Sequence, residues 1–421
     1  MNSRERLLTA IAGGKPDHIP LTFWCFGIPA PPDLMWERDG VARPYWYTGR
    51  LEHIHTLPSP WIFHDDDFER VKAWATLGVD DVLEVSVPWS IDPSVGIRDG
   101  VEPPAGPEGH GIFDNEIYPT LWREYDTPAG TLRHAVRNTG RFAEVGPGWV
   151  VQPDHVELME DFNIPRGVKH ALATPDDLPK LHYLLQGPTS AQLEVYRKRM
   201  AQVRSFAERE GVLVTGWSGF GMDLAVWLMG VEEAVMAAME QPDFFGETIA
   251  LIGDFDRLRT EVMLDVGGVD VVAERGWYSS TDFWSPRLFG KFLVPQILKV
   301  SNLAHQGGAK FAYTMTMGAH SMADLLVEAG VDLLYYVDPV QDKVDLASVK
   351  AKFRGRIAVA GGVNSAVTLG SGSRDGIRQA VRIAAQALGP DGYIMAPVDA
   401  IFPDTPWTSV EAMIEAWREV R

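Results

Sequence analysis

Short apolar runs alternate with longer stretches of helical periodicity from residue 205 to the end of the chain. Apolar residues at a spacing of three to four predict helices near 223–266, 287–306, 321–329, 345–353, 375–388 and 408–420. The intervening β-branched runs predict strands over 212–217, 269–274, 309–315, 331–337, 356–362 and 392–397. Strands that alternate with helices favour a parallel sheet with right-handed crossovers.

Two earlier apolar runs, 19–24 and 81–87, bring the number of predicted strands to eight, the number that closes a TIM-like barrel. The tripeptide Gly-Val-Asp occurs at 78–80, 268–270 and 330–332. In each copy the glycine can end a helix and the valine can begin a strand. A doubly wound open sheet is the alternative that this pattern leaves open.

Two segments interrupt the alternation. Residues 25–60 are rich in Trp, Tyr and Pro, and residues 90–170 are rich in Pro and Gly. Within the second segment, the turn at 127–130 between alternating apolar and polar residues predicts a β-hairpin. We interpret the chain as a single domain, 1–421, with both segments as excursions over the C-terminal mouth of the barrel.

The composition is that of a large globular protein with an acidic surface. Of 421 residues, 46% are hydrophobic and 23% are charged, and the net charge is −19. An acidic surface repels phosphate backbones and anionic lipids, so neither nucleic acid nor a membrane is an expected partner. A single cysteine, Cys25, excludes an internal disulfide, and the N-terminus lacks an apolar signal core. We therefore expect a cytoplasmic protein.

Functional groups of a parallel barrel come from the C-terminal ends of its strands. The side chains at or just after those ends include Trp24, Trp217, Glu274, Arg275, Met315, Met317, Asn364 and Asp399. We interpret Trp24, Trp217, Trp277, Tyr278, Met315 and Met317 as walls of a substrate pocket, and Arg275 and Asn364 as further substrate contacts. Apolar walls of this kind suit a small apolar or aromatic molecule.

Three titratable residues are candidates for proton transfer. Glu274 follows an apolar strand directly, and partial burial would raise its pKa toward a useful range. Asp399 lies upstream of the cap of the last helix, which leaves it without a capping role. His320 opens a predicted helix, where its imidazole could exchange a proton. Structural roles, in a loop ion pair for Glu274 and in a solvated first turn for His320, are the alternatives.

Two further clusters do not predict a metal site. The aspartates of "FHDDDFER" (63–70) suit a helix N-terminus, where negative charge is stabilised by the helix dipole. The histidines of "HIH" (53–55) share one face of an extended chain, but no third ligand accompanies them.

The sequence resembles the uroporphyrinogen decarboxylase superfamily over essentially its whole length. The resemblance is carried by "RERLLTAIAGGKPDHIPLTFW" at the start, "TPAGTLR", "LVEAGVDLL", "GGVN" (361–364) and "GPDGYIMAPVDAIFPDTPWTSVEAMIEA" at the end. The superfamily has a TIM-like barrel fold, and homodimers occur in it. Its decarboxylases carry an arginine motif near the N-terminus, but the matching stretch here, "TFWCFGIPAPPD", contains no arginine.

The corrinoid-dependent methyltransferases of the superfamily carry a zinc motif, His-x-Cys-Gly, with a later ligand near the last strand. By resemblance this motif falls on Met315-Thr316-Met317-Gly318, and the later ligand falls at or beside Asp399. Thioethers are weak ligands for zinc, so we predict no resident metal. The resemblance implies methyl transfer of the O-demethylation type, with a corrinoid supplied by a partner protein. A decarboxylase and a non-catalytic binding barrel are the alternatives.

Overall fold

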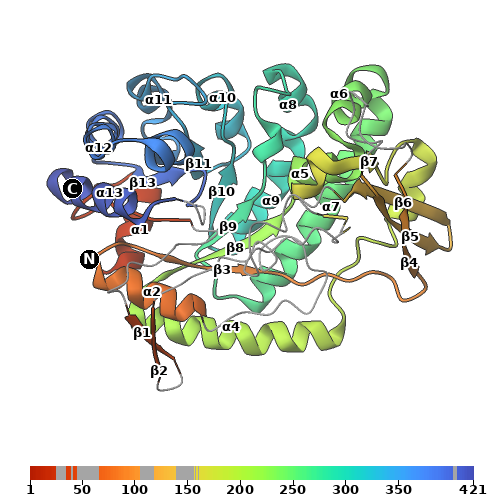
Figure 1. Cartoon of the computed structure of the whole chain (residues 1–421), viewed down its shortest axis with the longest axis horizontal. Helices are drawn as coiled ribbons and strands as arrows, with labels where there is room; N and C mark the ends of the chain where they lie inside the picture. The colour runs from red at the N-terminus through yellow and green to blue at the C-terminus, as the bar shows by residue number, and fades with distance from the viewer. Residues whose placement is uncertain are drawn as a thin grey trace.

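A computed structural model describes residues 1–24, 35–38, 41–44, 66–104, 118–138, 156, 158–159, 161–401 and 405–421. Its centre is a curled parallel sheet of seven strands in the order β13-β12-β11-β10-β9-β8-β3 (Figure 1). The strands are β3 (Val82–Ser86), β8 (Leu213–Gly219), β9 (Val271–Glu274), β10 (Lys310–Thr314), β11 (Leu333–Val337), β12 (Ala358–Asn364) and β13 (Tyr393–Val398). Spatial order follows chain order without reversal, as in a TIM-like fold and unlike a doubly wound sheet.

The predicted eighth strand is present only as an extended segment. Leu21 forms a single parallel bridge to Met395 of β13. The amide of Thr22 donates to the carbonyl of Met395 over 3.0 Å, and the amide of Asp80, just before β3, donates to the carbonyl of Leu21 over 2.9 Å. Pro20 has no N–H to extend the ladder. The described chain therefore has a seven-stranded sheet where the sequence predicts eight strands, with residues 19–24 bonded to both of its edges.

Helices surround the sheet (Figure 1). Their bounds are α1 (Ser3–Ile11), α2 (Asp66–Thr76), α3 (Leu178–Leu181), α4 (Ser190–Glu210), α5 (Gly221–Met229), α6 (Val231–Glu240), α7 (Pro242–Val266), α8 (Pro286–Phe292), α9 (Val294–Gln306), α10 (Ala319–Glu328), α11 (Leu346–Phe353), α12 (Arg374–Leu388) and α13 (Trp407–Val420). Short 3-10 helices are η4 (Asp161–Arg166), η5 (Pro175–Asp177) and η6 (Trp277–Ser279), and η7 (Ser365–Leu369) is a π-helix. None of these described helices combines the length and apolarity that a membrane span requires.

Two of the predicted helices are interrupted. The stretch predicted as one helix over 223–266 forms α5, α6 and α7, because Gly230 adopts a positive φ of 87° and Pro242 begins α7. The stretch over 287–306 divides into α8 and α9 at Leu293. The long helix α4 was not predicted; Thr189 caps its start together with Gln192, and Gly211 ends it at φ 65°.

The predicted hairpin is confirmed within a small antiparallel sheet. This sheet contains β4 (Gly96–Glu102), β5 (Thr120–Thr127), β6 (Gly130–Arg137) and β7 (Gly167–Lys169). Thr127 pairs with Gly130, so Pro128 and Ala129 form the two-residue turn. The sheet lies at one end of the molecule, beside α5 and α6 (Figure 1). In the first excursion β1 (Met35–Arg38) pairs with β2 (Val41–Pro44), and most of the rest lies outside the described residues. That the excursions cover the mouth stays a prediction.

Side chains alternate between two apolar layers. Ala273, Ala312, Ala360 and Ala396 belong to an inner cluster that also contains Leu7 of α1. The intervening residues of these strands, among them Val272, Phe311, Tyr313 and Val359, belong to the larger cluster between the sheet and the helices, which we call the outer cluster. Successive strand residues point to opposite faces, so this assignment decides which side chains can meet inside the curled sheet.

The glycines of the three Gly-Val-Asp tripeptides follow helices as predicted, but the valines do not begin strands, because β3, β9 and β11 begin two or three residues later. The aspartates have a further role. Gly78, Gly268 and Gly330 all have positive φ, between 71° and 95°, where an L side chain would be strained. The carboxylate of Asp270 accepts the amide of Val214 over 3.0 Å, and that of Asp332 accepts the amide of Phe311 over 2.8 Å. Each aspartate thus fastens the beginning of a neighbouring strand.

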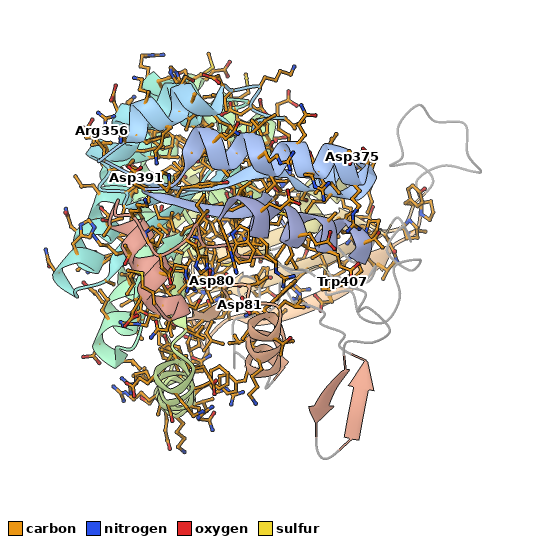
Figure 2. The ribbon with its side chains drawn as sticks, turned by 90° about the vertical axis from the view of Figure 1, so that its left-hand side faces the viewer. Asp80, Asp81, Arg356, Asp375, Asp391 and Trp407 are labelled. Atoms are coloured by element: carbon orange, nitrogen blue, oxygen red, sulfur yellow. The ribbon has the colours of Figure 1, made fainter. Side chains whose placement is uncertain are left out.

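In the first tripeptide the carboxylates anchor helices. Asp80 accepts the guanidinium of Arg6 in α1 over 2.6 Å, and the next residue, Asp81, accepts that of Arg70 in α2 over 3.1 Å. Figure 2 shows Asp80 beside α1 and Asp81 beside α2. Both carboxylates are buried, so the beginning of β3 and the two helices are fixed to one another.

Candidate functional site

Three tryptophans and a tyrosine from four different elements gather at the C-terminal ends of the strands. Ring centroids are 5.4 Å apart for Trp24 and Trp277, 5.9 Å for Trp217 and Trp277, and 6.2 Å for Trp24 and Trp217. The ring centroid of Tyr336 in β11 lies 6.3 Å from that of Trp24. The planes of these pairs are inclined by only 21° to 26°. We call these four residues the aromatic group.

Glu84 of β3 holds two of these rings. One of its carboxylate oxygens accepts the indole N–H of Trp24 and the other accepts that of Trp217, each over 3.0 Å. Glu84 shares a strand face with Val82 and Ser86, which is the inner face of the curled sheet. Burial raises the pKa of Glu84 to about 6, although Arg70 and the indole donors oppose the rise. A carboxyl group with this pKa can donate or accept a proton near neutral pH.

Asp399, directly after β13, holds the third indole. Its Oδ1 accepts the N–H of Trp277 over 3.0 Å, and the residue is half-buried. The structure therefore brings four sequence-predicted site residues together, Trp24, Trp217, Trp277 and Asp399. Two carboxylates approach the aromatic group, one from β3 and one from beyond β13.

Arg275 lies against the aromatic group from the end of β9. Its guanidinium carbon lies 4.6 Å from the ring centre of Trp277 and 4.9 Å from that of Trp227 in α5. Its Nε donates to Asp223 over 3.0 Å, and both side chains are buried. The second oxygen of Asp223 accepts the backbone amide of Tyr278. The charge of the Arg275 guanidinium is thus compensated by Asp223 within the protein. Arg275 is therefore poorly suited to bind a substrate carboxylate.

A buried arginine of α7 supports the site from behind. Arg259 donates to the hydroxyl of Ser86 and the carbonyl of Val87, each over 3.0 Å, and to the carbonyl of Ser218. These acceptors lie at the ends of β3 and β8, the strands that carry Glu84 and Trp217. Because charged hydrogen bonds are strong and directional, Arg259 fixes the spacing between those two strand ends.

Glu274 lies on the other face of the sheet. Ala273 belongs to the inner cluster, so its neighbour Glu274 points outward, where it lines a small cavity together with Asp256 of α7 and Gln296 of α9. It is only 3% exposed. Burial, and after it the charges of Asp256 and Asp223, raises its pKa well above the usual range. The structure does not bring Glu274 and Asp399 together, and a catalytic role for Glu274 stays a prediction.

The two methionines do not share a strand face, because β10 ends at Thr314. Met315 is fully buried in the cluster between sheet and helices. Met317 lies half-buried in the following bend, where its carbonyl accepts the amide of Thr281. Asp399 instead borders the inner side through Trp277. The positions matching the zinc ligands of the methyltransferases thus supply two thioethers and a carboxylate, and Met315 and Asp399 lie on different sides of the sheet, which does not fit zinc. Within the described chain, no group of three or more His, Cys, Asp or Glu side chains is placed to hold a metal ion.

The remaining predicted site residues are His320, Tyr278 and Asn364. His320 is exposed in the first turn of α10. Tyr278 packs against the outer cluster, and its carbonyl accepts the indole N–H of Trp284. Asn364 is buried at the end of β12, where its oxygen caps η7 at Val367 and its amide donates to Asp338 over 2.7 Å. These contacts give Asn364 a structural part, and binding roles for the three residues stay predictions.

Sequence reasoning missed Glu84 and Tyr336. The signal for Glu84 is a single carboxylate inside the apolar run "VLEVSV", which must be buried on both faces if the sheet is parallel. A polar residue in the middle of such a strand is exceptional and points to the interior of the sheet. Tyr336 carries no comparable signal, because it follows Tyr335 and either ring could have faced inward.

Comparison with known proteins supports the fold. The model of the uroporphyrinogen decarboxylase (URO-D) family matches residues 156–420, which is more than half of the chain. A methyltransferase from Methanosarcina mazei matches with a TM-score of 0.56 at 16% identity, over 100% of this chain and 99% of its own. A 3-keto-D-glucoside 4-epimerase from E. coli matches at 12% identity and a TM-score of 0.33, over 54% of this chain and 86% of its own. No curated protein matches the sequence.

Proposed function

Because the chain belongs to the uroporphyrinogen decarboxylase family, we propose that it is an enzyme that transfers a methyl group from a small apolar or aromatic ether to a corrinoid carried by a partner protein. The family and the methyltransferase neighbour support an enzyme of the methyltransferase or decarboxylase type. The step from this class to O-demethylation is the proposal.

One observation carries it: Glu84 lies between the indoles of Trp24 and Trp217, and burial raises its pKa to about 6. In demethylation of an ether, the bond between methyl carbon and oxygen breaks and its electron pair stays on the oxygen. The methyl group passes to the corrinoid, and a carboxylic acid gives its proton to the leaving oxygen. Proton donation of this kind contributes about 10²- to 10⁴-fold to a rate.

In this reaction the aromatic group binds the substrate. Its rings, stacked on one another, form an apolar wall beside Glu84 against which an aromatic substrate can pack, and aromatic contacts add about 0.5–1.5 kcal/mol per pair beyond burial. Asp399, bonded to Trp277, is the second acid of the site and could take the donor's part for a substrate bound nearer to β13.

Zinc has no step in this proposal. In the methyltransferases that the sequence resembles, zinc activates a thiol, but the residues at the corresponding positions here are Met315, Met317 and Asp399. Two thioethers and one carboxylate, with Met315 and Asp399 on different sides of the sheet, do not fit that ion.

The two alternatives are less well supported. A decarboxylase that grips carboxylates needs available arginines, and Arg275, which contacts Trp277, is paired with Asp223. A non-catalytic binding barrel would have its carboxylates neutralised by cations, whereas the hydrogen bonds of Glu84 come from neutral indoles.

The direct test is methyl transfer from a panel of aryl methyl ethers to free cob(I)alamin, followed by the absorption change of the corrinoid. We expect turnover with at least one ether, and a rate that falls as the pH rises above 6, because Glu84 must be protonated to donate. Absence of turnover across the panel, with release of carbon dioxide from aromatic carboxylic acids instead, would replace methyl transfer by decarboxylation.

A further inference from the structure

A second cavity lies at the opposite end of the sheet from the aromatic group, at the N-terminal ends of the strands. It has a volume of about 100 Å³ and is bordered by Gly13 after α1, by the beginnings of β10 and β12, by the end of α11 and by the turn before β13. Four cations line it, Lys310, Lys350, Arg354 and Arg356, together with two carboxylates, Asp332 and Asp391. In Figure 2, Arg356 and Asp391 lie close together on the same side of the molecule.

The charge of this lining is opposite to that of the whole chain. The protein carries a net charge of −19, yet the lining has an excess of two positive charges. Lys310 pairs with Asp332 over 2.9 Å, and Arg354 reaches Asp391 only over 3.7 Å. Arg356 pairs over 2.7 Å with Asp324, an exposed residue that is not part of the lining. Counting Asp324, three carboxylates serve the four cations of the lining, and Asp324 also pairs with Lys352, so the cations remain in excess.

Lys350 is bonded to the backbone of the turn before β13. It is half-buried, and its ammonium group donates to the backbone carbonyl of Asp391 instead of to a carboxylate. Burial and the nearby charge of Arg354 both lower its pKa, and the charge of Asp391 only partly opposes them. An ammonium group held beside another cation is stabilised when an anion enters.

Helix-end stabilisation accounts for only part of the cluster. Lys350 and Lys352 lie in the last turn of α11, where cations compensate the helix dipole. Lys310 and Arg356 lie at the beginnings of strands, so compensation of a helix dipole does not explain why they line the same cavity. Lys352, although it lies in the same turn, does not line the cavity and pairs with Asp324 over 3.4 Å.

We propose that this cavity binds a compact oxyanion of charge two, such as inorganic phosphate or the phosphate group of a small metabolite, between Lys350, Arg354 and Arg356. Its volume of about 100 Å³ is large enough for several water molecules, since roughly 10–15 Å³ of such space holds one water, and it therefore admits a small oxyanion. Arg354 and Arg356 both line it, and guanidinium groups offer the forked donors that phosphate oxygens prefer. The site lies away from the proposed catalytic group and is independent of the proposed function.

Equilibrium dialysis with radiolabelled inorganic phosphate, at an ionic strength held constant with chloride, tests this site. We expect saturable binding of one phosphate per chain to the wild type and to Lys352→Met, the matched control from the same helical turn. Lys350→Met should bind at least tenfold more weakly. Arg354→Met should weaken binding as well, and its side chain is 72% exposed, so this variant is expected to fold even if Lys350→Met does not.

Two outcomes would overturn the proposal: no saturable binding to the wild type, or equal binding by wild type, Lys350→Met and Arg354→Met. A thermal shift measured in parallel separates specific binding from the general stabilisation that phosphate gives to proteins. Specific binding raises the melting temperature of wild type and Lys352→Met more than that of the two cavity variants, whereas an equal rise in all four proteins speaks against a site.

Discussion

Glu84 is a half-buried carboxylate with a raised pKa, although both of its oxygens accept hydrogen bonds. Two neutral N–H donors satisfy its oxygens without fixing its charge, so burial controls the pKa and brings it to about 6. A lysine or arginine in the place of the indoles would hold the group ionised at neutral pH. The indoles thus position the carboxyl group and leave it free to exchange a proton.

A pH titration of tryptophan fluorescence should report this group. Protonation of Glu84 removes the charge that strengthens its bonds to Trp24 and Trp217, so the wild-type emission should change with a midpoint near pH 6. Glu84→Gln should lose this transition, whereas Glu274→Gln should keep it, because Glu274 lies on the opposite face of the sheet. A transition that persists in Glu84→Gln would assign it to another group.

His134 in β6 predicts a different pH dependence, that of stability. It is 2% exposed, neither ring nitrogen has a hydrogen-bond partner among the described residues, and burial lowers its pKa to about 3. Below pH 6.5 the unfolded chain binds a proton at this residue and the folded chain does not. The free energy of unfolding should therefore fall by up to about 1.4 kcal/mol per pH unit between pH 6 and pH 4 on account of His134.

Urea unfolding at several pH values measures this contribution. His134→Leu should show a shallower loss of stability than the wild type over that range, and His320→Leu, a substitution of an exposed histidine, should follow the wild type. Parallel curves for wild type and His134→Leu would mean that the imidazole is protonated in the folded protein.

The packing of β8 against β9 depends on a glycine. A Cβ atom at Gly219 would lie 2.3 Å from Cγ of Glu274, far inside van der Waals contact. Gly219→Ala should lower the free energy of unfolding by about 1–3 kcal/mol, the usual cost of overpacking. In Gly246→Ala, within α7, the nearest atom lies at 3.6 Å, and alanine favours the helix, so that variant should be neutral or more stable. Equal stability of both variants in urea would contradict the packing described here.

The aspartate of the second Gly-Val-Asp tripeptide fastens one strand to the next. Asp270 accepts the amide of Val214 over 3.0 Å and also pairs with Arg4 of α1. Asp270→Ala leaves a buried amide without its acceptor and should cost about 1–3 kcal/mol. Arg4→Ala removes only the ion pair of a half-exposed side chain and should cost less than about 1 kcal/mol. Unfolding of the two variants in urea compares these contributions, and a larger loss in Arg4→Ala would reverse their order.

Sequence patterns predicted the positions of the strands and of most helices better than they predicted the breaks within them. Seven of eight strands were found because buried parallel strands are continuous apolar runs, and the extended segment at 19–24 was called a strand for the same reason. Only pairing geometry could show that it makes a single bridge. The helix α4 has few apolar residues for its length, and five of its 21 residues are buried, so its periodicity is weak.

The candidate site could be predicted in part. Strand-end position identified Trp24, Trp217 and Asp399, since the ends of parallel strands meet at one edge, and Trp277 lies in the aromatic loop that follows Glu274. It misplaced Glu274 relative to Asp399, because a shift of one residue along a strand exchanges the two faces of the sheet. The same shift moved Met315 into the outer cluster. Which face of the sheet a side chain occupies can be decided only from the register of the strand. The sequence of a strand that is buried on both sides does not reveal that register.

The folded chain explains how distant segments cooperate in one site. Residue 24, β3, β8, η6, β11 and residue 399 each supply one group, and α7 fixes two of the strand ends through Arg259. A corrinoid partner protein, a homodimer and a cytoplasmic location remain predictions from the sequence.

Methyl transfer to cob(I)alamin by Glu84→Gln and Glu274→Gln, compared in one assay with the wild type, tests the central claim about the inner carboxylate most directly. If Glu84 donates the proton, Glu84→Gln should lose at least about 10²-fold in kcat/KM, while a folded Glu274→Gln stays within a few-fold of the wild type. Wild-type activity in Glu84→Gln, with loss in Glu274→Gln, would place the chemistry on the outer face of the sheet and contradict the site described here.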